Sequence, residues 1–174
     1  MKKTIQNVAK MKVYLDASFF GYLVGEASKL SHVAARQVAT AAWWRNEAEA
    51  CELFISDYVT AEIMDGDPSA ARLRANAAMG LPSLDGTSQS VVELAQRLLD
   101  AQALPEKAKT DAHHIATAAV YGMDALLTWN CRHMANIATL PRTVSVVARA
   151  GYRCPAIVTP IDFSKVKEAF NGSV

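Results

Sequence analysis

The chain has 174 residues, of which 51% are hydrophobic and 20% charged, and this composition excludes a wholly disordered protein. Eighteen Lys and Arg residues against seventeen Asp and Glu leave a formal net charge of +1, so nucleic-acid binding would need a local basic patch. No uncharged apolar stretch approaches the roughly 18 residues that a membrane span needs. We therefore expect one globular domain that folds around its own core without disulfides.

The two ends of the chain are expected to lie outside this domain. Residues 1–10 contain lysines but lack the apolar run of a secretory signal, and Met11 directly precedes the first predicted strand. We therefore expect an N-terminal extension over 1–10, a domain over 11–163 and a C-terminal tail over 164–174. The three cysteines form no CxxC pair, which is typical of reduced thiols. Without a signal or a span, the expected location is the cytoplasm and no membrane partner is expected.

Short β-prone segments alternate with helical patterns from the start of the domain. A strand is predicted over 12–15, and the apolar residues that follow indicate a short helix that ends before Gly25. The Ala-rich segment 31–50 has apolar residues at helical spacing, with Ser31 available as a cap. We expect Trp43 in this helix to pack into the core rather than to stack on a nucleobase.

The next strand is predicted over 53–55, with Ser56 as the N-cap of a helix that runs to about Met64. A break at the Asp and Gly residues that follow leads to a second helix over 69–79 and a short strand over 81–84.

In the second half, the predicted elements are a helix from Ser88 or Ser90 to about Leu99, a helix over 111–121, a strand over 125–129, helices over 131–138 and 141–150, and an extended segment over 155–160. Ser90 and Glu93 have the spacing of a capping box. Thr110 is the expected cap of the 111–121 helix, and Gly122 is its expected stop. Because strands alternate with helices throughout, we expect an α/β fold with a mainly parallel central sheet flanked by helices.

Polar residues follow the predicted strands at the positions where ligands bind in open parallel sheets, outside the carboxyl ends of the strands. Asp16 follows the first strand, Ser56 the second and Asn130 the third. Asp111 opens the helix that precedes the third strand, and Glu62 lies in the helix after Ser56. If these strand ends are neighbours, the side chains meet in one crevice.

Each of these residues also has a purely structural interpretation. Asp16 and Asp111 suit the first turn or the cap of a helix, Glu62 suits a solvated helix face, and Asn130 suits a turn. The structural interpretations do not predict that all four share one edge of the sheet, and that coincidence supports a functional site.

Three carboxylates in one crevice repel one another, and a divalent cation relieves this repulsion. Asp16, Glu62 and Asp111 offer the hard oxygen ligands that Mg²⁺ and Mn²⁺ prefer. Such an ion orients and deprotonates a water and stabilises charge on a phosphodiester. The residues therefore favour phosphodiester hydrolysis without a side-chain nucleophile.

The chain also resembles the PIN-domain family, and within it the VapC-type ribonuclease toxins of bacterial toxin–antitoxin pairs. Four segments carry the resemblance in the family's order: Val13-Tyr-Leu-Asp16-Ala-Ser, Ile55-Ser56 with Glu62-Ile, Thr110-Asp111-Ala with Ile115-Ala-Thr-Ala118, and Leu126-Leu-Thr128-Trp-Asn130-Cys-Arg-His133-Met134. The resemblance covers residues 12–163, and its last two segments are its most specific part.

This resemblance implies a PIN-like three-layer sandwich and a Mg²⁺- or Mn²⁺-dependent ribonuclease. It implies Asp16, Glu62 and Asp111 as acidic metal ligands, with Asn130 as the fourth site residue. It further implies RNA as the substrate, homodimerisation, and a small antitoxin protein whose peptide fills the active-site groove. Many PIN nucleases have a fourth acid where this chain has Asn130, which puts a firmly held second metal in doubt.

Several nearby residues have two interpretations. Thr128 can face the site and hydrogen-bond a ligand or water, or can simply be a β-prone residue. Arg132 can contact a substrate phosphate, whereas His133 more readily caps or packs its helix. His113 and His114 point about 100° apart on a helix, which argues against a shared zinc ion and favours structural roles.

Two other functional classes compete with a nuclease. A catalytically inactive PIN-like module that binds RNA or protein is the alternative that Asn130 keeps open. A haloacid-dehalogenase-like phosphatase also places an Asp after the first strand, but it needs an acid two residues later, where this chain has Ser18.

Overall fold

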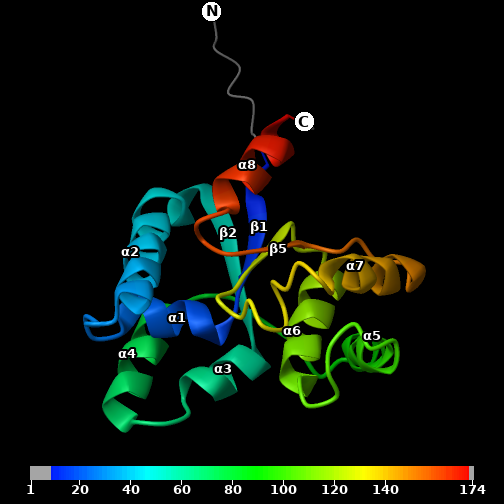
Figure 1. Ribbon diagram of the computed structural model, residues 1–174, viewed down its shortest axis with the longest axis horizontal. Helices are drawn as coiled ribbons and strands as arrows, with labels where there is room; N and C mark the ends of the chain where they lie inside the picture. Colours follow the sequence, from blue (N-terminus) through cyan, green and yellow to red (C-terminus); the bar gives the residue numbers. More distant parts are fainter. Residues whose placement is uncertain (1–8, 173–174) are drawn as a thin grey trace, which may run out of the picture.

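A computed structural model describes residues 9–172, and its centre is a five-stranded parallel sheet (Figure 1). The strands are β1 (Met11–Leu15), β2 (Cys51–Ser56), β3 (Ser83–Leu84), β4 (Ala125–Leu127) and β5 (Ala156–Val158). Their order in the sheet is β3-β2-β1-β4-β5, and every pairing is parallel. The carboxyl ends of all five strands therefore lie at one edge.

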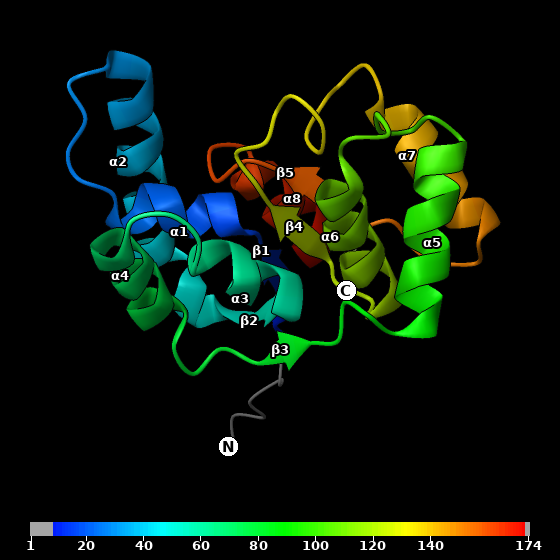
Figure 2. The same ribbon diagram turned by 90° about the horizontal axis from the view of Figure 1, so that it is seen from below.

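Helices cover both faces of this sheet (Figures 1 and 2). One side carries α1 (Ala17–Val24), α2 (Ser31–Asn46), α3 (Asp57–Ile63) and α4 (Pro68–Ala78). The other side carries α5 (Gln89–Asp100), α6 (Lys109–Val120) and α7 (Leu140–Arg149). The expected α/β fold with a parallel central sheet is confirmed, and the three layers are consistent with a PIN-like sandwich.

The sheet forms because its central strands are apolar on both faces. Val13, Tyr14 and Leu15 of β1 are completely buried, as are all three residues of β4. Such continuous apolar runs are typical of parallel strands covered by helices on both sides. Val13 pairs with Leu53 on one side and with Ala125 on the other, which fixes β1 at the centre of the sheet.

The start of α3 agrees with its sequence signal, whereas the start of α2 does not. Ser56 is the N-cap of α3, and its Oγ accepts a hydrogen bond from Val59 N at 3.4 Å. Ser31 is already the first residue of α2, and the N-cap position is held by Leu30 without a side-chain hydrogen bond. The helix expected over 31–50 ends at Asn46 and continues as a short 3₁₀ turn.

The capping box expected at Ser90 and Glu93 is wrong. The helix begins at Gln89, and the Glu93 carboxylate accepts a hydrogen bond from Gln89 Nε2 at 2.7 Å. Thr110 lies inside α6 rather than capping it, because that helix begins at Lys109. Gly122 has a φ of 66° directly after the last turn, which confirms it as the stop.

The helix expected over 131–138 is also wrong, because this segment is a series of turns. The Oδ1 atom of Asn130 accepts a hydrogen bond from His133 N at 3.1 Å, and that of Asn136 accepts one from Ala138 N at 3.0 Å. Asparagine side chains that bond nearby backbone groups in this way compete with helix formation.

The C-terminal residues form helix α8 (Phe163–Asn171) near the amino ends of the strands (Figure 1). Phe163 is buried against Trp43, at 5.2 Å between ring centroids, and Val166 and Phe170 pack against the core. The segment expected to be a tail thus includes this helix. Most of the expected extension, residues 1–8, lies outside the described residues. Within residues 9–172, no helix combines the length and apolar character required to cross a membrane.

Candidate functional site

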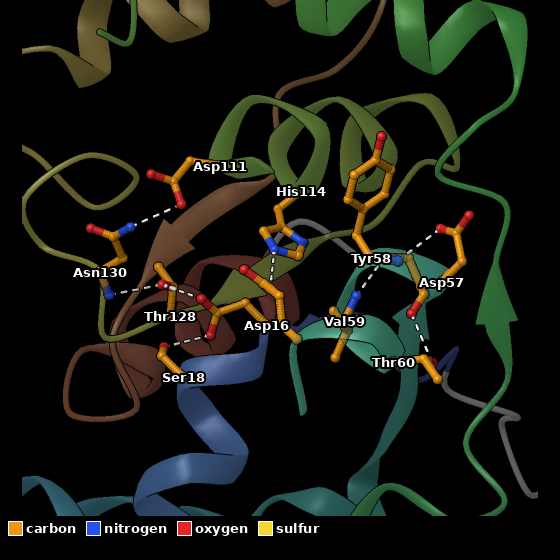
Figure 3. Close-up of polar contacts among 12 residues, drawn as sticks. Asp16, Ser18, Asp57, Tyr58, Val59, Thr60, Asp111, His114, Thr128 and Asn130 are labelled. Atoms are coloured by element: carbon orange, nitrogen blue, oxygen red, sulfur yellow. Dashed lines mark hydrogen bonds and ion pairs between the residues drawn. The ribbon is translucent and has the colours of Figure 1, made fainter. Parts of the chain in front are cut away.

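Asp16 lies at the carboxyl end of β1, where it is the N-cap of α1 and only 3% exposed (Figure 3). Its Oδ1 atom accepts hydrogen bonds from Ser18 Oγ at 2.6 Å and from Phe19 N at 3.2 Å. Its Oδ2 atom accepts one from Thr128 Oγ1 at 2.9 Å. The buried carboxylate is therefore held by donors from α1 and from the segment after β4.

Thr128 and Asn130 connect this carboxylate to Asp111 at the start of α6 (Figure 3). Asn130 N donates to Thr128 Oγ1 at 2.9 Å, and Asn130 Nδ2 donates to Asp111 Oδ1 at 2.9 Å. The Asp16 network, defined as Asp16, Thr128, Asn130 and Asp111, is thus continuous from β1 to α6. The structure brings together four of the residues singled out from the sequence.

His133 completes the surroundings of Asp111. Its Nδ1 atom lies 2.8 Å from Asp111 Oδ2 and donates to it, because a carboxylate only accepts. Both side chains are mostly buried, with 19% of His133 and 16% of Asp111 exposed. Arg132, the neighbouring residue expected to bind substrate, is exposed at the surface.

Glu62 belongs to a second set of contacts at the same edge of the sheet. Its Oε2 atom lies 2.8 Å from Nε2 of His114, whose side chain is 1% exposed whereas that of Glu62 is 41% exposed. The Nδ1 atom of His114 lies 2.8 Å from the Tyr14 hydroxyl, which lies 2.6 Å from Ser56 Oγ. Glu62 is therefore joined to α6 through a buried histidine rather than directly to Asp16 or Asp111.

The donors and acceptors in this second set of contacts can be assigned from its two ends, the Glu62 carboxylate and the backbone N of Val59. The Glu62 carboxylate only accepts, so His114 Nε2 carries a proton, and Nδ1 of the neutral ring accepts from Tyr14. The Tyr14 oxygen then accepts from Ser56, whose own oxygen accepts from Val59 N. Every polar atom of the buried chain is satisfied in this arrangement.

Burial raises the pKa of Asp16 above its usual range, and this effect outweighs the opposing influences. A positive charge on His114, present only when its ring is protonated at both nitrogens, acts to lower that pKa, as do hydrogen bonds from Ser18, Thr128 and Phe19 N. Burial also raises the pKa of Tyr14, and the charges of Asp16 and Glu62 raise it further. The two acids act on the same hydroxyl, so the two sets of contacts are electrostatic neighbours.

His114 is the site residue that the sequence interpretation missed. The sequence favours a structural or surface role for its side chain, because no zinc partner has a suitable spacing. The available signal was its position three residues after Asp111, since residues at this spacing share one face of a helix.

The donor set fits a hard divalent cation in kind, because carboxylate oxygens of Asp16 and Asp111 are the ligands that Mg²⁺ and Mn²⁺ prefer. Asp16 Oδ2 and both oxygens of Asp111 each accept one hydrogen bond and retain lone-pair capacity, whereas Asp16 Oδ1 already accepts two. No group of three or more His, Cys, Asp or Glu side chains in the described part of the chain is arranged to hold a metal ion. The expected three-acid cluster is thus present as two neighbouring sets, with Glu62 held apart by His114.

Comparison of the sequence with protein-family models and with curated proteins, and of the structure with solved structures, gave no significant match.

Proposed function

We propose that this protein is a Mg²⁺- or Mn²⁺-dependent endoribonuclease that hydrolyses RNA phosphodiester bonds and serves as the toxin of a toxin–antitoxin pair. The observation that supports this best is the hydrogen-bonded connection of Asp16 to Asp111 through Thr128 and Asn130. It joins two acids that are 95 residues apart in the chain at the ligand-binding edge of a parallel sheet. The resemblance of the same residues to PIN-domain motifs is the reason for proposing metal-dependent RNA hydrolysis at this edge.

Asp16 and Asp111 would hold the metal ion, and the resemblance implies Glu62 as a third ligand, although its carboxylate contacts His114 in this structure. When bound, the ion supplies activation of a water and stabilisation of charge on the phosphodiester. Ser18 and Thr128 fix the two oxygens of Asp16, and Asn130 and His133 fix those of Asp111. Donors on both carboxylates orient them before a substrate arrives, which lowers the cost of reorganisation during the reaction.

A second candidate is a PIN-like module that binds RNA or protein without cleaving it. Asn130 favours this alternative, because its amide adds no negative charge and its Nδ2 donates to Asp111. The neutral side chain can still offer a carbonyl oxygen to a metal-bound water, so the two functions differ in one measurable property, cleavage.

The test is cleavage of labelled RNA by the purified protein in the presence of Mg²⁺ or Mn²⁺. Asp16→Asn and Asp111→Asn are expected to abolish cleavage. Asp100→Asn is the matched control, because Asp100 is exposed on α5 and contacts Gln96 instead of the site. RNA that is bound but never cut would refute the nuclease and support the binding module.

The toxin assignment needs a separate test. Expression of the protein alone is expected to arrest growth, and co-expression of a small protein encoded beside it is expected to relieve the arrest. Harmless expression in the absence of any such neighbour would remove the toxin assignment and leave the nuclease assignment standing. The expected homodimer is tested by sedimentation of the purified protein with and without the antitoxin.

A further inference from the structure

Arg36 on α2 is held against two aromatic side chains. Its Nη1 atom donates a 2.9 Å hydrogen bond to the Tyr22 hydroxyl on α1. Its guanidinium carbon lies 5.5 Å from the centre of the Tyr22 ring and 5.3 Å from that of the Trp129 ring. The side chain is half-buried and forms no salt bridge with any Asp or Glu of residues 9–172. The positive charge of Arg36 is therefore fixed in place, and its guanidinium retains N–H donors that can bind a ligand.

Trp129 connects this arginine to the Asp16 network. It lies between Thr128 and Asn130 in the chain, and its backbone N donates to Ser18 Oγ at 2.9 Å. The residue is 6% exposed, and its Nε1 donates to Thr40 Oγ1 on α2 at 2.8 Å. The cation is thus connected to Asp16 through Trp129 and Ser18, and Trp129 directly precedes Asn130, which binds Asp111.

A pocket of about 600 Å³ lies between α1 and α2, and it is lined by Tyr22, which binds Arg36, and by Ser18, which binds Asp16. Ser18, Tyr22 and Gln37 are among its lining residues. Gln37 anchors the loop that lines the pocket, because its Nε2 donates to the carbonyls of Gly25 at 3.1 Å and Glu26 at 2.7 Å. Its Oε1 accepts a hydrogen bond from the Ser28 backbone N at 3.1 Å, so this side of the pocket is ordered before any ligand binds. The volume lies within the range of about 300–1,000 Å³ that is typical of ligand pockets.

We propose that Arg36 binds a phosphate of single-stranded RNA next to the bond that is cut, and that the α1–α2 pocket receives the adjoining nucleoside. This inference rests on the proposed function and specifies where the substrate lies on it. A guanidinium presents several N–H donors in a fixed plane that matches phosphate oxygens. Partial burial strengthens such a contact, and the hydrogen bond to Tyr22 limits the side-chain freedom that binding must remove.

The binding arm measures anisotropy of a labelled, short single-stranded RNA in EDTA, so that the result does not depend on cleavage. Arg36→Gln is expected to weaken binding about tenfold or more, the effect of losing a charged hydrogen-bonding group. The slope of log K against log salt is expected to fall by about 0.7 for the lost phosphate contact. Arg45→Gln is the matched control, because it removes the same charge from an exposed position on the same helix. It is expected to leave affinity within about twofold of the unsubstituted protein.

The cleavage arm separates this inference from the proposed function. If RNA is cut and Arg36→Gln has the same KM and kcat as Arg45→Gln, the phosphate site is refuted and the nuclease survives. If no RNA is cut but binding still depends on Arg36, the phosphate site is supported and the nuclease is refuted.

Two further variants cover the case in which Arg36→Gln fails to fold, which thermal unfolding detects. Tyr22→Phe keeps the ring and removes only the acceptor of Arg36, and Arg36→Lys keeps the charge without the planar donors. Both are expected to weaken RNA binding in EDTA, Arg36→Lys more strongly. Affinities equal to those of the unsubstituted protein for both variants would overturn the proposal.

Discussion

His114 lies between Glu62 and Tyr14, with its Nε2 atom 2.8 Å from Glu62 Oε2 and its Nδ1 atom 2.8 Å from the Tyr14 hydroxyl. The imidazole is fixed at both nitrogens and is almost fully buried. It therefore holds the partly exposed carboxylate of Glu62 against α6, the helix that also carries Asp111. We interpret His114 as a positioning residue for Glu62.

Replacement of His114 tests this role. His114→Phe is expected to lower kcat at least about tenfold with little change in KM, since it removes the donor that orients Glu62. It is also expected to lower the free energy of unfolding by about 1–3 kcal/mol, because the buried Tyr14 hydroxyl loses its acceptor. His114→Gln, which keeps a donor and an acceptor, is expected to recover part of kcat. A variant with normal kcat but reduced stability would show that His114 is only structural, and His32→Gln at an exposed position serves as the control.

Asp16→Asn is expected to stabilise the metal-free protein at pH 7. Burial raises the folded-state pKa of Asp16, whereas the unfolded-state pKa is about 3.9. Below the unfolded-state pKa both states are protonated and the buried carboxyl carries no penalty, but stability is lost as the pH rises through the folded-state pKa. The variant has no group to ionise, so its advantage should be present at pH 7 and disappear below about pH 4.

Urea unfolding of both proteins in EDTA across this pH range measures the difference. A variant less stable than the original chain at pH 7 would mean that hydrogen bonds to the ionised Asp16 from Ser18 and Thr128 outweigh its burial.

Added Mn²⁺ is expected to raise the melting temperature of the unsubstituted protein. Binding to the folded state alone, at a hundredfold excess over Kd, contributes about 2.7 kcal/mol. For a chain of this size that corresponds to roughly 5–10 °C, at about 2–4 °C per kcal/mol. Asp111→Asn is expected to lose most of the shift, and Asp100→Asn to keep it. An equal shift in all three proteins would place Mn²⁺ somewhere other than the Asp16 network.

Asn130→Asp restores an acid at the neutral position of the network and should have opposite effects with and without metal. It replaces the Nδ2 donor to Asp111 by a second carboxylate, so the metal-free protein is expected to lose about 1–3 kcal/mol of stability. The same charge should enlarge the melting-temperature shift with Mn²⁺ beyond that of the unsubstituted protein. Unchanged values under both conditions would show that residue 130 points away from the metal in solution.

The parallel sheet could be predicted because its signal is local and repeated. The buried runs of β1, β2 and β4 are short, apolar and separated by helical patterns, so both the class of fold and the strands that position Asp16 and Asn130 follow from the sequence. The segment 131–138 could not be assigned in this way. This segment does not form a helix because the side chains of Asn130 and Asn136 accept hydrogen bonds from nearby backbone N–H groups. The amino-acid composition does not show which backbone groups these side chains bond.

The site residues also differ in how well the sequence predicts them. The rule for strand ends, which depends only on strand direction, places Asp16, Ser56 and Asn130 at one edge. The pairing of Glu62 with His114 depends on how closely α3 approaches α6, which is a property of tertiary packing. The sequence therefore predicts which residues lie at this edge of the sheet better than it predicts which of their side chains bond one another.

The central position of β1 has a consequence for how the protein is made. The Thr128–Asp16 hydrogen bond spans 112 residues, and β1 cannot pair with β4 until residue 127 has been synthesised. A growing polypeptide that stops before this point has Asp16 with its donors from α1, but it lacks Thr128 and Asn130, which connect Asp16 to Asp111. Such a polypeptide cannot assemble the site, so the proposed cleavage of RNA cannot begin while the protein is still being translated through its first two thirds.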